Sequence, residues 1–179
     1  MIPYYGLQAP AEGGHYESWF VRANHPHKPQ AIWIRYTLFR ARDQRPALGE
    51  VWAVWSDGAR QQTHAFKEEF PLEHCLMAAD RLAVEIGGNR LEPGKLHGGA
   101  SLNGHRIEWD LRYQGGQEPL LLLPEDRYRA GFPKAKSLVS RPAVRVSGQV
   151  RVDGDAMQLE HWPGSENHNW GKRHTDQYA

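Results

Sequence analysis

Hydrophobic and polar residues alternate with a period of two along much of the chain, a pattern typical of strands in an antiparallel sheet. The alternation is clearest over residues 106–113, where the apolar row includes Trp109. It returns over residues 143–152, where Gly148 interrupts the apolar row and predicts a bulge or bend. Because successive side chains of a strand point to opposite faces, both segments are predicted to have one buried and one solvent-exposed face.

Turn residues separate the strands at the spacing that hairpins need. The Asn-Gly pair at 103–104 and the Asp-Gly pair at 153–154 tolerate the positive φ angles of tight turns. Further strands are predicted over residues 16–22, 30–40, 48–55, 62–70, 82–86 and 157–162. Residues 73–80 leave room for at most one short helix, and residues 115–139 predict a long irregular connection that closes one mouth of a barrel. We therefore expect an all-β fold, an antiparallel barrel or a strongly curved sandwich.

Two of these strands are apolar on both faces. In residues 30–40 one row contains isoleucine, tyrosine and leucine, and the other contains Trp33, Arg35 and a phenylalanine. Residues 48–55 have the same character, with Trp52 on the opposite side from a valine and a second tryptophan. A strand that is buried on both faces suits a barrel that packs against something outside itself. We therefore expect another domain or a second copy of the chain at this surface.

Composition and charge narrow the class of protein. The length suits one domain over residues 1–179, and 22 basic against 21 acidic side chains leave a net charge of +1. That balance gives no electrostatic footprint for nucleic acid or an anionic membrane surface, and it favours neutral partners. Cys75 is the only cysteine, which excludes an intrachain disulfide and suits a reducing, cytoplasmic setting. No signal peptide is recognisable, and the apolar run at residues 120–123 is too short to span a bilayer.

The densest group of candidate functional residues lies in residues 161–179, which contain three histidines and two tryptophans. A Pro-Gly pair at 163–164 predicts that this stretch begins as a loop. Imidazoles exchange protons near neutral pH, and indole rings exclude water and stabilise a passing cation. We interpret the stretch as a site for acid-assisted chemistry on an apolar ligand. The alternative is that His168 and Asn169 satisfy backbone groups in a buried turn and that Trp170 is a core residue.

Other kinds of site find little support in the sequence. No zinc motif matches the spacing of the histidines at positions 25, 27, 161, 168 and 174. Phosphate-binding loops, nucleophile elbows and dinucleotide fingerprints are also missing. Glu17 and Arg35 lie among aromatic neighbours, where they either form a buried pair or point outward. We therefore predict neither a metal nor a cofactor.

Residues 16–25, 31–39, 49–55 and 167–178 together resemble lipocalin-like proteins related to hydroxyneurosporene synthase, the carotenoid hydratase. Tocopherol cyclase and fungal lipocalin-like Diels–Alderases are more distant members of the same broad group. The resemblance implies a lipocalin-like fold and a hydrophobic ligand held near the junction of two tandem domains. It also implies that this chain corresponds to the first of those domains and has a second lipocalin-like domain or another copy of itself as partner.

The resemblance extends to a short motif. A His-x-Trp element lines the reaction pocket of the hydratases, and His168-Asn169-Trp170 matches it. The Tyr and Asp that complete the hydratase site lie downstream of Ala179 in such proteins. On this basis His168 and Trp170 are the expected catalytic residues. The expected substrate-binding residues are Glu17, Trp33, Arg35, Trp52, Trp109, Asn169 and His174.

Three hypotheses for the function follow. In the first, the pocket binds an isoprenoid or polyketide-like molecule and promotes hydration or cyclisation without a cofactor, as a hydratase or cyclase would. In the second, the domain is a non-catalytic module that binds a lipophilic molecule or packs on a partner domain. The third is a carbohydrate-binding β-sandwich that presents Trp33, Trp52 or Trp55 as a stacking platform, a hypothesis that inward-pointing tryptophans would argue against.

Overall fold

The structure, a computed structural model, describes residues 14–43 and 45–172. It is all-β, and its only helical segments in these ranges are two short 3-10 turns, η2 (Leu72–His74) and η3 (Glu125–Tyr128). The strands are β1 (His15–Asn24), β2 (Gln30–Arg40), β3 (Leu48–Asp57), β4 (Gln62–Pro71), β5 (Cys75–Met77), β6 (Val84–Ile86), β7 (Asn89–Glu92), β8 (Lys95–Leu102), β9 (His105–Gly115), β10 (Leu120–Leu121), β11 (Ala135–Val152) and β12 (Asp155–Gly171). The predicted fold class is confirmed.

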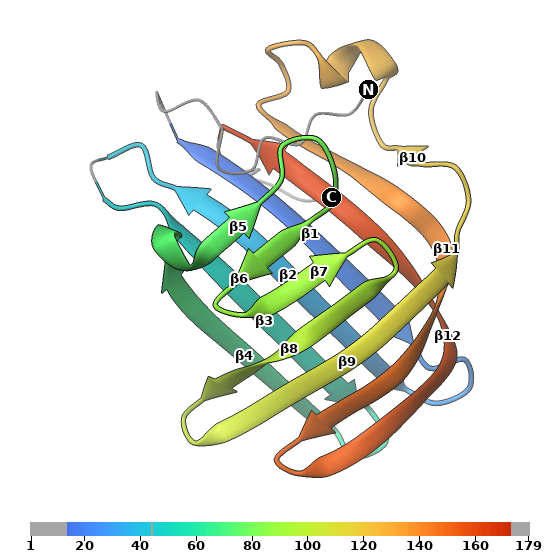
Figure 1. The fold of residues 1–179 in the computed structure, drawn as a ribbon. Helices are drawn as coiled ribbons and strands as arrows, with labels where there is room; N and C mark the ends of the chain where they lie inside the picture. The colour runs from blue at the N-terminus through green and yellow to red at the C-terminus, as the bar shows by residue number, and fades with distance from the viewer. Residues whose placement is uncertain (1–13, 44, 173–179) are drawn as a thin grey trace.

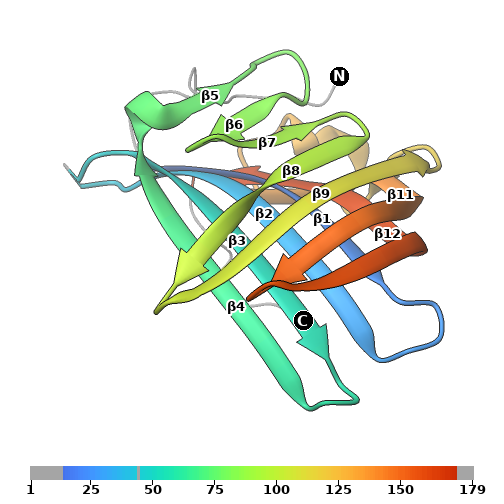
Figure 2. The same ribbon diagram turned by 60° about the horizontal axis from the view of Figure 1, so that its bottom comes forward.

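All strands belong to one antiparallel sheet that curls into a nearly closed barrel. The order is β4-β3-β2-β1-β12-β11-β9-β8-β7-β6-β5, and β10 pairs with β11 beyond the end of β9. The curl makes β1 to β4 face β8, β9, β11 and β12 across the interior (Figure 2). Where β4 approaches β8, the backbone N–H of Ser101 donates to Glu68 Oε1 at 2.6 Å. The two walls therefore come into contact at this point.

The two ends of the barrel carry different connections (Figure 1). The lower end is formed by the tight turns that join β3 to β4, β8 to β9 and β11 to β12. At the upper end β1 starts, β12 ends, and residues 116–134 connect β9 to β11. The interior of the barrel differs between the lower and the upper end.

Strict alternation of side chains determines what the barrel encloses. Along β3, residues change from buried to half-buried at every step, so Val51 and Trp55 point inward and Trp52 points outward. The lower interior is packed with apolar side chains. They include Ile32, Trp55, Ile107, Val150, Leu159 and Trp162.

The last two strands are longer than the sequence indicated. The prediction that residues 163–164 end a strand and begin a loop is wrong, because β12 runs without interruption from Asp155 to Gly171. His161 has a φ of 53°, which bends the strand while its pairing with β11 continues on both sides. The bulge predicted at Gly148 is confirmed by a shift in register there and a φ of 132°. A Cβ at this position would lie 2.2 Å from the carbonyl oxygen of Asp110, so only glycine fits.

Two other regions differ in detail from the prediction. Strands β7 and β8 were not anticipated, since residues 89–102 are rich in glycine and charge. The candidate helix at residues 73–80 is a single 3-10 turn followed by β5. No helix in the described ranges is long and apolar enough to cross a membrane.

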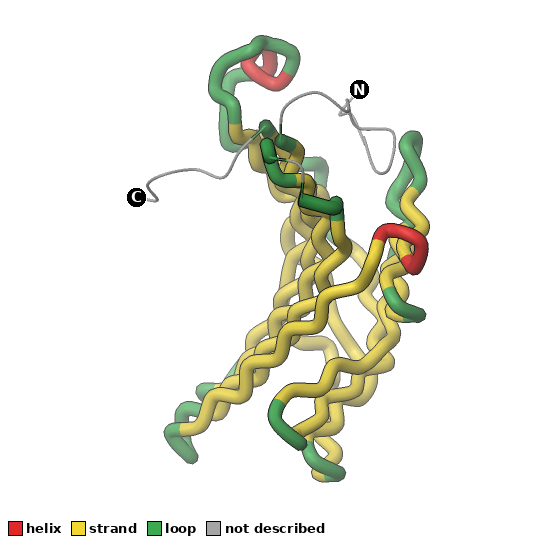
Figure 3. The backbone as a smooth tube through the Cα atoms, turned by 90° about the vertical axis from the view of Figure 1, so that its left-hand side faces the viewer, coloured by secondary structure: helices red, strands yellow, loops and turns green. Residues whose placement is uncertain are grey.

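The long connection between β9 and β11 packs on one side of the upper end instead of spanning it. It contains β10 and η3, and it stands above one wall of the barrel in the side view of Figure 3. Tyr128 and Leu123 pack on Leu138 and Trp170, and this small cluster is separate from the main core. The expected closure of a barrel mouth is thus a local cover over the ends of β11 and β12.

Candidate functional site

A buried polar cluster lies inside the upper end of the barrel. Glu17 of β1 lies between two imidazoles: His168 Nε2 is 2.8 Å from Glu17 Oε1, and His15 Nε2 is 3.3 Å from Glu17 Oε2. Glu17 and His168 are 0% exposed, and His15 is 7% exposed. Strand pairing explains the meeting, since Glu17 pairs with Trp170 and the next inward residue, Trp19, pairs with His168. We call His15, Glu17 and His168 the His–Glu cluster.

Four aromatic rings form a stack that contains the His168 imidazole. Trp19 lies on one side of it, with ring centroids 5.4 Å apart and planes at 4°, and Trp170 lies on the other side, at 4.5 Å and 23°. Tyr128 of η3 then stacks on Trp170 at 5.8 Å. The stack fixes the plane of the imidazole and leaves the edge of the ring, not its faces, for chemistry.

Burial decides the charge of His168. Desolvation holds the pKa of this imidazole below its ordinary value of 6.5, and the nearby His15 acts in the same direction, while the hydrogen bond and charge of Glu17 oppose them. The ring is therefore neutral near pH 7. A neutral ring that donates from Nε2 to Glu17 has its basic nitrogen at Nδ1, so it is equipped to accept a proton.

A donor beside this ring has no partner in the described part of the chain. The indole N–H of Trp19 is buried and meets no acceptor there, although Trp19 is only 1% exposed. A buried donor left without an acceptor costs free energy that a bound oxygen atom would recover. Its position next to His168 makes it a candidate contact for the oxygen of a ligand or of water.

A second carboxyl group is buried on the same inner row of β12, two residues before His168. Glu166 is 5% exposed, and its Oε2 lies 2.6 Å from the hydroxyl of Tyr113 on β9. The same hydroxyl lies 3.2 Å from the carbonyl oxygen of Glu92. The Tyr113 hydroxyl donates its one proton to Glu166, and the Glu92 carbonyl oxygen is a second, longer contact of the same hydroxyl.

The surroundings of Glu166 favour the protonated form. Desolvation raises the pKa of this carboxyl above its ordinary value, and it outweighs the opposing effects of the Tyr113 hydrogen bond and the Arg141 charge. Desolvation and the neighbouring Glu166 likewise raise the pKa of Tyr113. The upper interior thus contains an imidazole whose pKa is lowered and a carboxyl group whose pKa is raised.

The structure brings together only part of the predicted site. Glu17, His168 and Trp170 meet at the upper end, as described. Trp109 is buried elsewhere in the core, where its Nε1 donates to the Tyr36 hydroxyl across the barrel at 3.2 Å. Asn169 points to the outer face, opposite to its two neighbours in the motif. His174 lies outside the described residues.

Trp33, Arg35 and Trp52 are on the outer face of the sheet and away from the His–Glu cluster. Arg35 Nε donates to Thr37 Oγ1 at 3.0 Å, and its guanidinium lies over the rings of Tyr16 and Trp33. The buried pair between Arg35 and Glu17 that the sequence left open does not form, because the two side chains lie on opposite faces.

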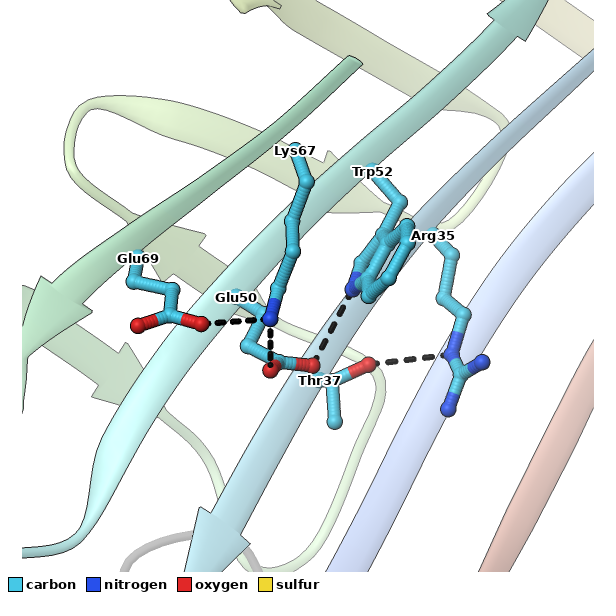
Figure 4. Close-up of polar contacts among 6 residues, drawn as sticks. All are labelled: Arg35, Thr37, Glu50, Trp52, Lys67 and Glu69. Carbon is cyan, nitrogen blue, oxygen red and sulfur yellow. Dashed lines mark hydrogen bonds and ion pairs between the residues drawn. The ribbon is translucent and has the colours of Figure 1, made fainter. Parts of the chain in front are cut away.

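Figure 4 shows the remainder of this outer network, which centres on Glu50. Trp52 Nε1 donates to Glu50 Oε2 at 3.0 Å, and Lys67 Nζ lies 2.9 Å from Glu50 Oε1. Lys67 also pairs with Glu69, and its ammonium lies 4.9 Å from the centre of the Trp52 ring. The charges on this face are therefore satisfied by one another, and the tryptophan face is covered.

Sequence reasoning missed His15, Trp19, Tyr113, Tyr128 and Glu166. For three of them a signal existed. His15 and Trp19 are two residues on either side of Glu17, so a strand over 16–22 extended by one residue puts all three on one face, and Glu166 is two residues before His168. No comparable signal links Tyr113 and Tyr128. They come from another strand and a 3-10 turn, and only the closure of the barrel brings them to the upper end. Among the described residues, no group of three or more His, Cys, Asp or Glu side chains is arranged to hold a metal ion.

Comparisons with known proteins support the fold. No protein-family model and no curated protein matches the chain. The chain is similar in structure to a protein of Nitrosomonas europaea provisionally assigned as AttH, with 14% sequence identity and a TM-score of 0.60 over 92% of this chain and 53% of that one. It is also similar to kievitone hydratase from Nectria haematococca, with 15% identity and a TM-score of 0.48 over 93% and 51% of the two chains. The chain spans about half the length of these solved proteins, and the likeness to the Nitrosomonas europaea protein shows a shared fold.

Proposed function

We propose that the upper end of the barrel binds an apolar, isoprenoid or polyketide-like molecule and promotes addition of water, or cyclisation, without a cofactor. The observation that carries this proposal is the buried His–Glu cluster inside a stack of aromatic rings. Stability alone gives no reason for such an arrangement, because apolar side chains of similar size commonly replace buried ionisable pairs without loss. The resemblance of His168-Asn169-Trp170 to the hydratase motif agrees with it.

His168 acts as the base in this proposal. During hydration of a carbon–carbon double bond, one alkene carbon gains a proton and the other gains the oxygen of water, which then loses a proton to the base. Neutral His168 accepts that proton at Nδ1, while the Glu17 carboxyl stabilises the resulting imidazolium through Nε2. The indole N–H of Trp19 donates to the oxygen that is added.

Glu166 supplies the proton to the alkene carbon. Glu166 and His168 are on the same inner row of β12, with their Cα atoms about 7 Å apart along the strand. Two groups whose surroundings push their protonation in opposite directions divide the roles of acid and base between them. The proton that His168 takes from water then returns to Glu166 through solvent or product exchange, so that the cycle closes.

The alternative of a non-catalytic binding or packing module also has support. Both faces of the His168 ring and both faces of Trp170 are occupied by other rings, an arrangement that equally suits a rigid lining for a bound lipid. On the outer wall, half-buried Trp33 and Trp52 suit contact with a second lipocalin-like domain or a second copy. The carbohydrate hypothesis has the weakest support, since Trp55 points inward and cations cover the other two indoles.

Retention of a ligand tests the binding part of the proposal. The purified full chain is extracted with organic solvent, and the extract is analysed by mass spectrometry for apolar molecules. We expect an isoprenoid or polyketide-like compound in the extract, whereas recovery of polar glycans alone would overturn the proposal in favour of the carbohydrate hypothesis.

Incorporation of labelled oxygen tests the catalytic part. The recovered compound, or an acyclic polyene as a probe, is incubated with the chain in water enriched in oxygen-18. We expect one heavy oxygen per hydrated product, or a cyclised isomer without it, and a loss of at least about a hundredfold in rate for His168→Gln and for Glu166→Gln. His105→Gln is the matched control, because His105 also pairs with a carboxylate, Asp153, but at the exposed lower end. If the compound binds and neither product forms, the domain is a binding module.

A further inference from the structure

Exposed apolar side chains gather on the connection between β9 and β11. Six large hydrophobic residues are exposed in the described part of the chain, and four of them lie within this connection. They are Leu120 at 53%, Leu121 at 38%, Leu122 at 55% and Phe132 at 72% exposed. Single exposed leucines are ordinary on protein surfaces, but a group on one projecting segment indicates an interaction site.

The backbone beneath these side chains is held in place by hydrogen bonds. Leu120 and Leu121 form β10, which pairs with β11 at Val139 and Leu138. The Tyr128 hydroxyl accepts the backbone N–H groups of Leu122 and Leu123 at 2.9 and 3.2 Å, and it donates to the carbonyl oxygen of Ser137 at 2.8 Å. The leucines are exposed on a hydrogen-bonded segment, and β10 lies at the upper end of the barrel (Figure 1).

Three basic side chains lie on the outer wall just below this segment. Lys95 of β8 pairs directly with Arg112 of β9, and Arg145 of β11 pairs with Gln114, the next outward residue along β9. All three cations are exposed, and none forms an ion pair within residues 14–43 and 45–172. Because β9 and β10 pair with the same edge of β11, the basic group and the leucines lie along one line of the wall.

We propose that Leu120, Leu121, Leu122 and Phe132, together with Lys95, Arg112 and Arg145, form a surface that docks on a bilayer containing anionic lipids. We call these seven residues the docking tip. Apolar side chains on a projecting segment enter the boundary between headgroups and acyl chains, and cations a short distance behind them contact the phosphates. The overall charge of +1 gives no hint of this, since the basic group is local.

Charge complementarity favours a lipid surface over a protein partner. An interface with another protein leaves few charged groups unpaired at its centre, and aromatic anchors usually dominate it. Here leucines predominate, and none of the three cations forms an ion pair within the described residues, with Glu92 the residue that lies opposite Lys95 on β7. Docking would bring the upper end of the barrel to the phase in which isoprenoid ligands dissolve, but the proposal stands on the docking tip and does not need the His–Glu cluster to be catalytic.

Co-sedimentation with vesicles tests the proposal on the full chain. Vesicles of phosphatidylcholine with phosphatidylglycerol are compared with vesicles of phosphatidylcholine alone. We expect the chain to sediment with the first and much less with the second. The double variant Leu120→Ser, Leu122→Ser should lose at least about tenfold in partitioning. Arg112→Gln with Arg145→Gln should lose about fivefold for each charge, and added salt should weaken only the unmutated chain.

Two other exposed leucines provide the matched control. Leu76 is 64% exposed on β5 and Leu102 is 43% exposed at the lower end, so Leu76→Ser with Leu102→Ser removes as much surface apolarity elsewhere. This variant should sediment as the unmutated chain does, and circular dichroism checks that each variant is folded.

Equal losses in both leucine variants, or no sedimentation of the unmutated chain, would overturn the proposal. So would a dimer in light scattering that the Leu120 and Leu122 changes alone dissociate, since that result assigns the surface to a second copy. The vesicles contain no ligand, so failure here leaves the extraction and labelling results unaffected.

Discussion

The lower and upper halves of the barrel interior are built from the same strands, yet they bury opposite kinds of side chain. In the lower half the rings of Trp55 and Trp162 lie 5.9 Å apart among aliphatic residues. In the upper half the same inner rows of β1 and β12 carry Glu17, His168 and Glu166. Apolar burial stabilises a fold, whereas polar burial costs free energy unless every group is satisfied. The difference indicates that the lower half maintains the barrel and the upper half gives up stability for groups that exchange protons or bind.

The largest effect should come from emptying the lower half. Trp162 is 3% exposed and contacts Trp55 and His25, so Trp162→Ala leaves a cavity in the main core and should cost about 3 to 5 kcal/mol of unfolding free energy. Denaturant titration measures the loss. Trp33→Ala is the matched control, because Trp33 is half-buried on the outer face and should cost less. An equal cost for the two substitutions would contradict the division into a stabilising interior and an outer wall.

A smaller loss of unfolding free energy is expected when the buried polar groups of the upper half are replaced. Glu17→Met or His168→Phe alone removes one partner of a buried bond, and each should destabilise the chain by about 3 kcal/mol. The double variant should be more stable than the sum of the two losses predicts, by more than about 1 kcal/mol, because the second change removes the group that the first leaves without its bond. His15 loses Glu17 in the single and the double variant alike, so its loss cancels in the cycle, and Phe keeps a ring between Trp19 and Trp170. The measurement is a double-mutant cycle of unfolding free energies.

The surface pair of His105 and Asp153 provides a reference for that cycle. Its atoms are as close, at 2.7 Å, but both side chains are exposed at the lower end. Changing them to Gln and Asn should give nearly additive effects, since solvent screens the pair. If the Glu17 and His168 changes were also additive, the two histidine–carboxyl pairs would be equivalent, and the upper half would hold no special polar arrangement.

Most of the fold could be predicted from the sequence because one face of each long strand is apolar. The alternation over residues 106–113 and 143–152 indicates which side chains point inward, and the structure has both patterns as predicted. The alternation does not predict where a strand ends when pairing with neighbouring strands extends it. Residues 163–164 look like a turn, but pairing with both β1 and β11 keeps them in β12.

The candidate site could be predicted only as far as local periodicity reaches. His168 and Trp170 share a face because they are two residues apart, and the same rule removes Asn169 from that face. The partner of His168 comes from β1, 151 positions earlier, and Glu166 finds Tyr113 on β9, 53 positions away. Such meetings depend on strand order and on the curl of the sheet, and neither is encoded in the spacing of residues along one strand.

The smallest expected effect concerns Glu166, one of the two buried carboxyl groups in the upper half. The pKa of Glu166 is raised in the folded chain, so above the unfolded value of about 4.5 the folded state retains a proton that the unfolded state has released. The stability that this group contributes is therefore present at low pH and is lost as the pH rises through the folded pKa. Glu166→Gln keeps an acceptor for Tyr113 and removes the titration. Thermal unfolding between pH 4 and 8 should show the variant equal to the unmutated chain at the acid end and more stable at neutral pH, by on the order of 1 kcal/mol. The pKa of His168 is lowered, so its contribution to stability is present above pH 6.5 and is lost as the pH falls, in the unmutated chain and in the variant alike. If Glu166→Gln instead lost stability at neutral pH, Glu166 would be ionised in the folded chain and could not be the proton donor.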